Sequence, residues 1–309
     1  MDGKRGFSME INVVIQEFGF DCKIRKLSPK TIENYQKQLT YLQRYLADEH
    51  NTTLIEAVRS IHIKQFLAMM DEKGRKPQYI NDLLKVFKTF FNYCEKEGHI
   101  KTSPAASIRN MKQPKVVIMT FSENEIRGLL NHFSGRDFIS IRNKTIIALL
   151  FDTGMRLAEV INLRSEQIHD EYILVHGKGN KERLVPVSPI LAKQLLRYRT
   201  VRDSYFEDKR FPEGFVFVSN RGKQLTPEVI GMFLKQAAKE VGVNPQVRVS
   251  PHTCRHTFAH LQLKNGLDLY SLSRLMGHEN VAITQRYLAG LQNTEIVKAA
   301  QKTGVLFNL

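Results

Sequence analysis

Cationic side chains recur in the second half of the sequence, in segments that resemble helix starts. In SPHTCRHT, residues 250–257, Ser250 is suited to cap a helix and Pro251 to occupy its first position. His252 and Arg255 lie three residues apart, so they project from one face near the helix N-terminus, where the helix dipole favours an anion. A guanidinium can hold two phosphate oxygens at once. The segment therefore indicates a phosphate-binding pair, although an ordinary surface helix start also produces this pattern.

Two further segments carry side chains of the same kind. Arg156 follows a Thr-Gly break in TGMRLAEV and precedes a predicted helix, and Glu159 is spaced to pair with an arginine and fix its side chain. Lys178 lies between two glycines in a predicted hairpin turn, where it is unhindered and could deliver a proton. A solvated Arg–Glu pair and an exposed loop lysine are the alternatives for these segments taken singly.

A tyrosine completes the set. Tyr287 follows His278, in the segment LMGH, by nine residues. A tyrosine hydroxyl is a poor nucleophile at neutral pH because its ordinary pKa is about 10. Nearby cations favour the ionised phenol and stabilise a five-coordinate phosphorus transition state. A tyrosine among arginine, lysine and histidine side chains therefore has a chemical use that a tyrosine in an apolar core lacks.

The charge of the chain agrees with a polyanionic partner. The 309 residues carry a formal net charge of +15. Residues 1–114 hold 19 Lys and Arg against 13 Asp and Glu, and the remainder is basic as well. An excess spread over both halves favours DNA or RNA contacted by both, and a basic surface that serves solubility is the alternative.

Composition also excludes several classes. No apolar run reaches the roughly 20 residues of a membrane span, and the N-terminus lacks a signal-peptide stretch, so we expect a cytoplasmic protein without a membrane partner. Three widely spaced cysteines form no disulfide framework, which fits a reducing compartment. His252, His256 and His260 could share a helix face beside Cys254, but the spacing is poor for zinc, so we predict no metal site.

The elements that must position these residues fall into two groups. Apolar residues at three- and four-residue steps predict helices from about residue 29, over 61–70 and over 77–96, with basic outer faces. After a basic, irregular segment, a capping box at Ser122 starts a second group, with helices to about residue 152, strands at 172–175 and 183–187, a further short strand at 215–219, and helices at 189–198, 227–241 and 251–265. We predict a leader at 1–22, a helical DNA-binding domain at 23–108, a linker at 109–120, a catalytic domain at 121–292 and a tail at 293–309. Candidate DNA contacts are Lys30, Lys85, Lys88, Lys112 and Lys115.

The order of the motifs along the chain is more informative about function than any single motif. TGMRLAEV, GKGNKERLVP, HTCRHTFA and LMGH, followed by the tyrosine, resemble the tyrosine recombinase (phage integrase) family, most closely its short two-domain Xer-like and transposon-encoded members. The resemblance covers residues 28–287. It implies a mainly α fold with a small β-sheet, in which a helical core-binding bundle and a mixed α/β catalytic domain form a C-shaped clamp on DNA.

The resemblance also implies roles. Tyr287 would attack the scissile phosphate, join the 3′ end and release a 5′ hydroxyl, without a metal or other cofactor. The roles of the other residues are as follows: Arg156 and Arg255 hold the non-bridging oxygens, Lys178 is the general acid, His252 assists proton transfer, His278 hydrogen-bonds the phosphate, Glu159 supports the first arginine, and His256 is a structural neighbour.

The implied partner is double-stranded DNA with inverted-repeat core sites, held by a tetramer of identical or mixed subunits on two duplexes. The tail at 293–309 would then dock in a neighbouring subunit or on its own. Too few residues precede the bundle for a separate arm-binding domain, and the tail departs from the Xer ending, so we expect integration, excision or resolution of a mobile element. Xer-type chromosome or plasmid dimer resolution is the alternative. A DNA-binding protein without catalysis and a type IB topoisomerase are rivals, and the complete polar set disfavours the first.

Overall fold

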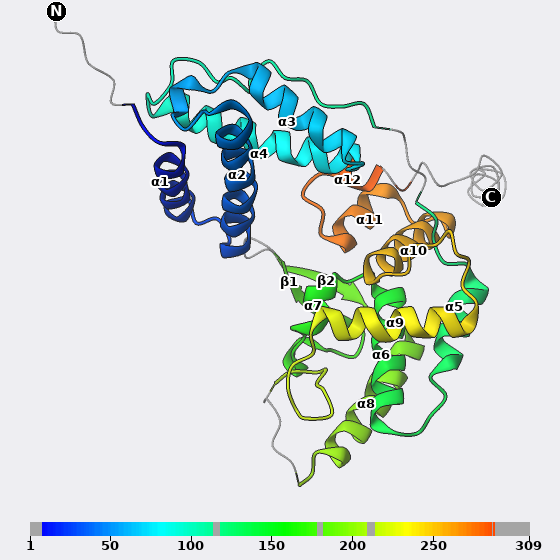
Figure 1. The fold of residues 1–309 in the computed structure, drawn as a ribbon. Coiled ribbons are helices and arrows are strands. Elements are labelled where there is room, and N and C mark those ends of the chain that lie inside the picture. Colours follow the sequence, from blue (N-terminus) through cyan, green and yellow to red (C-terminus); the bar gives the residue numbers. More distant parts are fainter. Residues whose placement is uncertain (1–7, 114–117, 178–181, 209–213, 286, 288–309) are drawn as a thin grey trace, which may run out of the picture. The chain divides into compact units, whose positions relative to one another are not determined.

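The computed structural model describes residues 8–113, 118–177, 182–208, 214–285 and 287 (Figure 1). The chain divides into two compact units, residues 1–115 and 116–309, called here the N-terminal and the C-terminal unit. Each is described by itself. None of the helices among the described residues combines the length and the hydropathy of a membrane span.

The N-terminal unit is a bundle of helices. Its helices are α1 (Ile11–Ile24), α2 (Pro29–His50), α3 (Ser60–Glu72) and α4 (Pro77–Lys96), with a short 3-10 turn at Ile55–Ala57. Ser28 caps α2 by accepting a hydrogen bond from the Thr31 backbone N–H, and Pro29 occupies the first position, so the helix begins where the sequence predicts. The bundle closes over an apolar core that includes Phe18, Phe66 and Phe90.

Helix α1 was not expected from the sequence. It lies largely inside the predicted leader, and its residues Ile11, Phe18 and Cys22 are buried in the bundle core. The three- and four-residue spacing is present there, but Phe20 and Ile24 on the other side are also apolar and are 63% and 81% exposed. Because apolar residues lie on both sides, the stripe that marks a helix is blurred.

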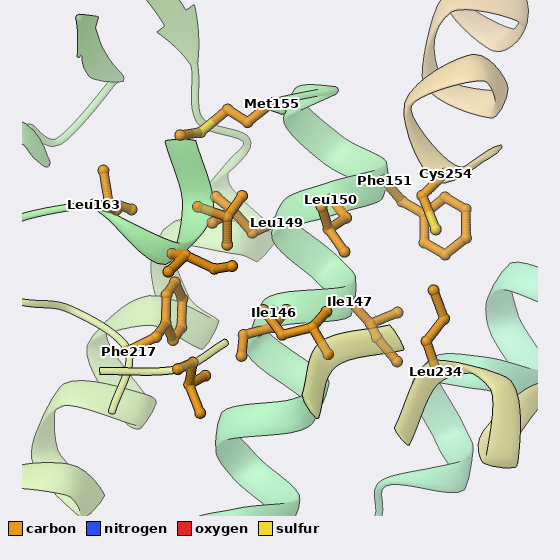
Figure 2. Packing of buried hydrophobic residues seen from close by; sticks show 14 of the residues in the cluster. Ile146, Ile147, Leu149, Leu150, Phe151, Met155, Leu163, Phe217, Leu234 and Cys254 are labelled. Carbon is orange, nitrogen blue, oxygen red and sulfur yellow. The ribbon is translucent and has the colours of Figure 1, made fainter. Parts of the chain in front are cut away.

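The C-terminal unit is built around α6 (Phe138–Thr153), whose residues Ile146, Ile147, Leu149 and Leu150 are fully buried (Figure 2). Helices pack on it from several sides. They are α5 (Glu123–His132), α7 (Leu157–Ile161), α8 (Pro189–Tyr205), α9 (Pro227–Val241) and α10 (Pro251–Lys264). The capping box predicted at Ser122 is present: Ser122 and Glu125 bond each other's backbone N–H groups.

Among the described residues, the sheet consists of β1 (Tyr172–His176) and β2 (Glu182–Pro186), which pair antiparallel with Val175 opposite Arg183. Residues 215–219, predicted as a strand, make only single bridges, Arg164 with Phe215 and Val218 with Gln224. The prediction of a strand there is wrong because these bridges join the segment to short loops that offer no continuous ladder.

Two helices of the C-terminal unit end at glycines next to predicted site residues. Helix α6 ends at Gly154 and α11 (Leu269–Met276) ends at Gly277, both in the left-handed conformation. A β-carbon on Gly154 would lie 2.3 Å from the Phe258 ring, so glycine is required by both the backbone conformation and the space. Helix α11 and the short α12 (Val281–Gln285) were not predicted from the sequence.

Candidate active site

Arg156 is the residue that precedes the first turn of α7, and Glu159 holds it there. The Glu159 carboxylate accepts from the Arg156 backbone N–H at 2.7 Å and from its Nη1 at 3.0 Å. The Nη2 of Arg156 donates to the Gly277 carbonyl at 2.8 Å. The pairing predicted from the three-residue spacing is therefore present. The Arg156 side chain remains 42% exposed, so its guanidinium reaches solvent beside these anchors.

Arg183 approaches the same carboxylate from β2. Its Nη1 and Nη2 donate to the two oxygens of Glu159 at 2.9 and 2.7 Å, and its Nε donates to the Leu275 carbonyl at 2.8 Å. Burial alone would raise the pKa of Glu159, but the hydrogen bonds and charges of Arg183 and Arg156 lower it below its ordinary value. Glu159 is therefore an ionised carboxylate shared by two arginines.

Arg183 was not singled out from its sequence. The signal that would have found it is the alternation of β2, in which Arg183 shares a face with the buried Val185 while Leu184 on the other face is 55% exposed. A charged residue on the core-facing side of a strand needs a buried partner. Here that partner is Glu159.

Arg255 lies deeper than Arg156. It is 4% exposed, and it donates to the Gly154 carbonyl through Nη1 and to the Met276 carbonyl through Nη2. Burial, reinforced by repulsion from Arg156, lowers the pKa of the Arg255 guanidinium to about 10. Two arginines that repel each other would both be stabilised by an anion placed between them.

The start of α10 is as predicted, with Ser250 accepting from the Thr253 backbone N–H and Pro251 at the first position. His252 and Arg255 nevertheless differ in burial: His252 is exposed, whereas Arg255 points into the unit. Cys254 faces the apolar core, and burial raises the pKa of its thiol. Within the described residues, no three His, Cys, Asp or Glu side chains are placed to hold a metal ion.

His278 connects Arg255 to the tyrosine segment. Its Nε2 lies 3.2 Å from Nη2 of Arg255, and its Nδ1 lies 2.8 Å from the Thr284 hydroxyl. Arginine carries only donors, so Nε2 of His278 accepts and, in the neutral ring, Nδ1 donates to Thr284. Thr284 in turn accepts from the Tyr287 backbone N–H through its carbonyl.

Tyr287 packs among histidine rings. It stacks on His278 with ring centroids 6.4 Å apart, and its centroid lies 5.1 Å from that of His256, which itself contacts His252 at 4.2 Å. The tyrosine is 8% exposed and belongs to an apolar cluster with Phe258 and Met276. The charge on an ionised Tyr287 would act on Arg255. The five described members of the predicted catalytic set thus lie together in one unit.

This network carries an excess of positive charge. Its described side chains include three guanidiniums, those of Arg156, Arg183 and Arg255, and one carboxylate, Glu159. A groove of about 1240 Å³ opens over part of it, lined by Arg156, Arg183 and His278 among others. An oxyanion with two negative charges, such as a phosphorane, matches this excess.

Several predicted residues fall elsewhere. Lys178, Lys115 and the tail at 293–309 lie outside the residues that the structure describes. In the N-terminal unit, Lys30, Lys85 and Lys112 are exposed and Lys88 is half-buried. Lys30 pairs with Glu33 at 2.9 Å, which offsets part of its charge. Their contact with DNA stays a prediction.

Known proteins resemble the chain in both units. The model of the phage integrase family matches residues 119–293, and that of the phage integrase N-terminal SAM-like domain matches residues 22–98. Among individual relatives, the tyrosine recombinase XerD of Lacticaseibacillus casei is 33% identical over 281 residues, which cover 90% of this chain and 94% of the relative. The tyrosine recombinase XerC of Alcanivorax borkumensis is 32% identical over 85% of this chain and 84% of its own length.

Solved structures share the fold at lower identity. The Tn1549 transposon integrase in complex with transposon right end DNA has a TM-score of 0.76 at 17% identity and covers 96% of this chain and 100% of that one. The XerH site-specific recombinase bound to a palindromic difH substrate has a TM-score of 0.75 at 18% identity, over 96% of this chain and 84% of that one.

Proposed function

This chain belongs to the phage integrase family and is a tyrosine recombinase, an enzyme that cleaves and rejoins DNA at specific sites, and from that premise we propose which residues perform the reaction. The observation that carries the proposal is the position of Tyr287 against His278 in an arginine-rich network. Such a network stabilises a negatively charged phosphorus centre.

In the proposed reaction, Tyr287 is the nucleophile. Its hydroxyl oxygen bonds to the scissile phosphorus, the bond from phosphorus to the 5′ oxygen breaks, and a 3′-phosphotyrosine link forms. Attack of a 5′ hydroxyl on that link reverses the step and releases Tyr287, so no cofactor is consumed. When the reversing hydroxyl comes from a partner duplex, strands are exchanged.

The remaining roles divide between charge and protons. Arg156 and Arg255 would bind the non-bridging oxygens, with Glu159 orienting the first. Lys178 would protonate the leaving 5′ oxygen, and His252 would take part in proton transfer by accepting the proton that the Tyr287 hydroxyl loses. A phosphate oxygen entering between Arg255 and His278 would replace their 3.2 Å contact, and a proton on Nε2 would let His278 donate to it.

A nicked suicide duplex tests the assignment. Binding selection from a random duplex pool first identifies the core site, and a duplex nicked near the cleavage point then traps the covalent adduct. We expect wild-type protein to form the adduct and Tyr287→Phe to form none. An adduct with the Phe variant would refute Tyr287 as the nucleophile. Absence of any wild-type adduct would indicate a DNA-binding protein without catalysis. Adducts that form independently of the DNA sequence would indicate a topoisomerase.

We propose integration, excision or resolution of a mobile element as the biological process, carried out in the cytoplasm by a tetramer on two inverted-repeat core sites. Xer-type dimer resolution is a second candidate, favoured by the similarity to XerD and XerC proteins. Sequencing the DNA attached to Tyr287 in cells separates them: mobile-element ends support the first, and a chromosomal locus independent of such elements supports the second. Sedimentation of the protein with core DNA tests the tetramer and shows whether a different subunit is needed.

A further inference from the structure

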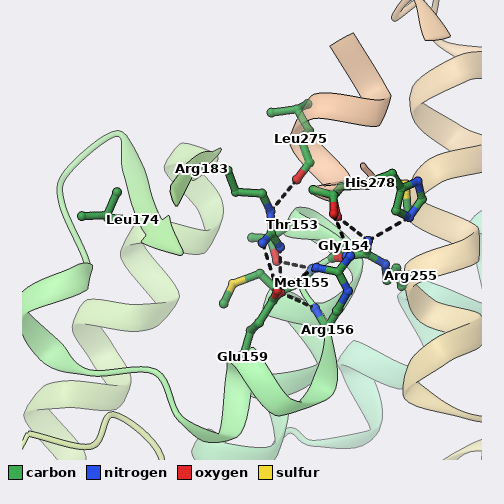
Figure 3. A network of polar contacts seen from close by, with 12 residues as sticks. Thr153, Gly154, Met155, Arg156, Glu159, Leu174, Arg183, Arg255, Leu275 and His278 are labelled. Carbon is green, nitrogen blue, oxygen red and sulfur yellow. Dashed lines mark hydrogen bonds and ion pairs between the residues drawn. The ribbon is translucent and has the colours of Figure 1, made fainter. Parts of the chain in front are cut away.

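Arg183 joins three parts of the C-terminal unit that the proposed reaction uses. It lies at the start of β2, and its guanidinium binds both Glu159, the partner of Arg156, and the Leu275 carbonyl near the end of α11. All three nitrogens of its guanidinium are engaged (Figure 3). A single side chain thus connects the strand, α7 and the segment that leads to His278.

The packing around Arg183 is close. Its side chain is 10% exposed, and a β-carbon on Gly277 would lie 3.0 Å from Cδ of Arg183. The glycine therefore leaves room for this arginine as well as ending α11. Gly277 also gives its carbonyl to Arg156, so both arginines bind the same helix end.

The two arginines use Glu159 differently. Arg183 makes a two-pronged pair with both carboxylate oxygens and is nearly buried. The Arg156 side chain binds one of these oxygens through Nη1 and stays 42% exposed, while its backbone N–H binds the other. Among the described side chains of the network, only that of Arg183 thus holds both oxygens, and Glu159 in turn orients the more exposed guanidinium. We propose that Arg183 is a positioning residue for DNA cleavage, which acts through Glu159 to aim Arg156 at the scissile phosphate.

This inference rests on the proposed function, and lysine is the informative substitution. Lysine keeps the charge but has one nitrogen, so it cannot bind both carboxylate oxygens and the Leu275 carbonyl in the same plane. Arg183→Lys should therefore keep an ion pair with Glu159 but no longer fix the orientation of the Glu159 carboxylate. Arg202→Lys is the matched control, because Arg202 is a buried arginine of the same unit that binds a carboxylate, Asp203, and backbone carbonyls outside the network.

Single-turnover adduct formation on the nicked core-site duplex gives the first readout. We expect Arg183→Lys to slow it about 100-fold, the cost of a misplaced group, and Arg202→Lys to leave it unchanged at a similar loss of thermal stability. The double variant Glu159→Gln with Arg183→Lys should be no slower than the slower single variant, because both act through one path. Additive losses, or equal losses in Arg183→Lys and Arg202→Lys, would overturn the proposal.

Two modified duplexes identify the path. A methylphosphonate at the scissile position removes one negative charge, so it needs less help from Arg156, and the deficit of Arg183→Lys should shrink to below about 10-fold. A 5′-bridging sulfur makes a leaving group that needs no general acid, and it should not rescue the variant. An unchanged deficit on the methylphosphonate, or rescue by sulfur, would show that Arg183 acts elsewhere. Failure of wild-type protein to form any adduct would instead refute the proposed function itself.

Discussion

Helices α4 and α10 have similar N-termini but different roles. Each has proline at its first position, and each packs on other helices of its own unit. In α4 the buried residues lie mostly on one side and, apart from Asn81, are apolar, with Lys85 exposed on the other. In α10 residues 253–259 are all buried in an unbroken run, and among them are Arg255 and His256.

The difference separates stabilising a fold from building a site. A helix with one apolar side packs that side against a core and leaves the opposite side for solvent and charged residues. Such a helix buries few polar groups. A helix buried all round must find partners for every polar group it carries. For Arg255 those partners are the carbonyls of Gly154 and Met276, and they place a cation where the proposed chemistry needs one.

The largest effect should come from Arg255, the buried arginine of α10. Arg255→Lys should slow adduct formation by about 1000-fold, or ~4 kcal/mol, because one nitrogen cannot reach two helix ends and a phosphate. Single-turnover cleavage of the nicked duplex measures this. Cys254→Ala is the control on the neighbouring, core-facing position, and it should cost roughly 1 kcal/mol of stability without slowing cleavage. Equal rates for Arg255→Lys and wild type would mean that burial of this arginine is only structural.

The matching change in α4 should act on stability. Phe90→Ala removes a ring that packs on Phe18 and Phe91, and it should lower the free energy of unfolding of the N-terminal unit by about 3 kcal/mol. Urea unfolding followed separately for the two units measures it, and the transition of the C-terminal unit should stay in place. Asn92→Ala, two residues later and exposed, is the control with little effect. A loss in both units would contradict the division of roles between the two helices.

The ion pairs of Glu159 make the free energy of unfolding of the C-terminal unit depend on pH. Because the pKa of Glu159 in the folded chain lies below its ordinary value of 4.5, its stabilisation is complete above that pH and is lost as pH falls through the lowered value. Glu159→Gln should therefore cost about 2 kcal/mol at pH 7 and progressively less in acid. Unfolding curves of wild type and variant from pH 7 to pH 3 should converge, and a constant gap would assign the loss to packing instead.

The contrast also explains what the sequence could predict. The spacing of apolar residues predicts α4 at both ends, and the Ser-Pro start predicts α10, because these signals are local. The partners of Arg255 cannot be predicted in this way, since Gly154 is 101 residues away and its carbonyl is presented only after α6 ends. Arg183 was missed for the same reason: its partner, Glu159, comes from another element. Motif order grouped Arg156, Arg255 and His278, which lie together in the structure, and tertiary packing determines their contacts.

The smallest effect should come from the exposed side of α4. Lys85 is surface-exposed, so Lys85→Gln should leave stability and the rate of cleavage at saturating DNA unchanged. If Lys85 contacts a phosphate, the slope of log binding constant against log salt concentration should become shallower by about one. Fluorescence anisotropy of a labelled core duplex across a salt series measures this, with the Lys30→Gln variant, whose charge is already offset by Glu33, expected to change the slope less. An unchanged slope in Lys85→Gln would remove α4 from the DNA-contacting surface and leave its basic side with solubility as its only role.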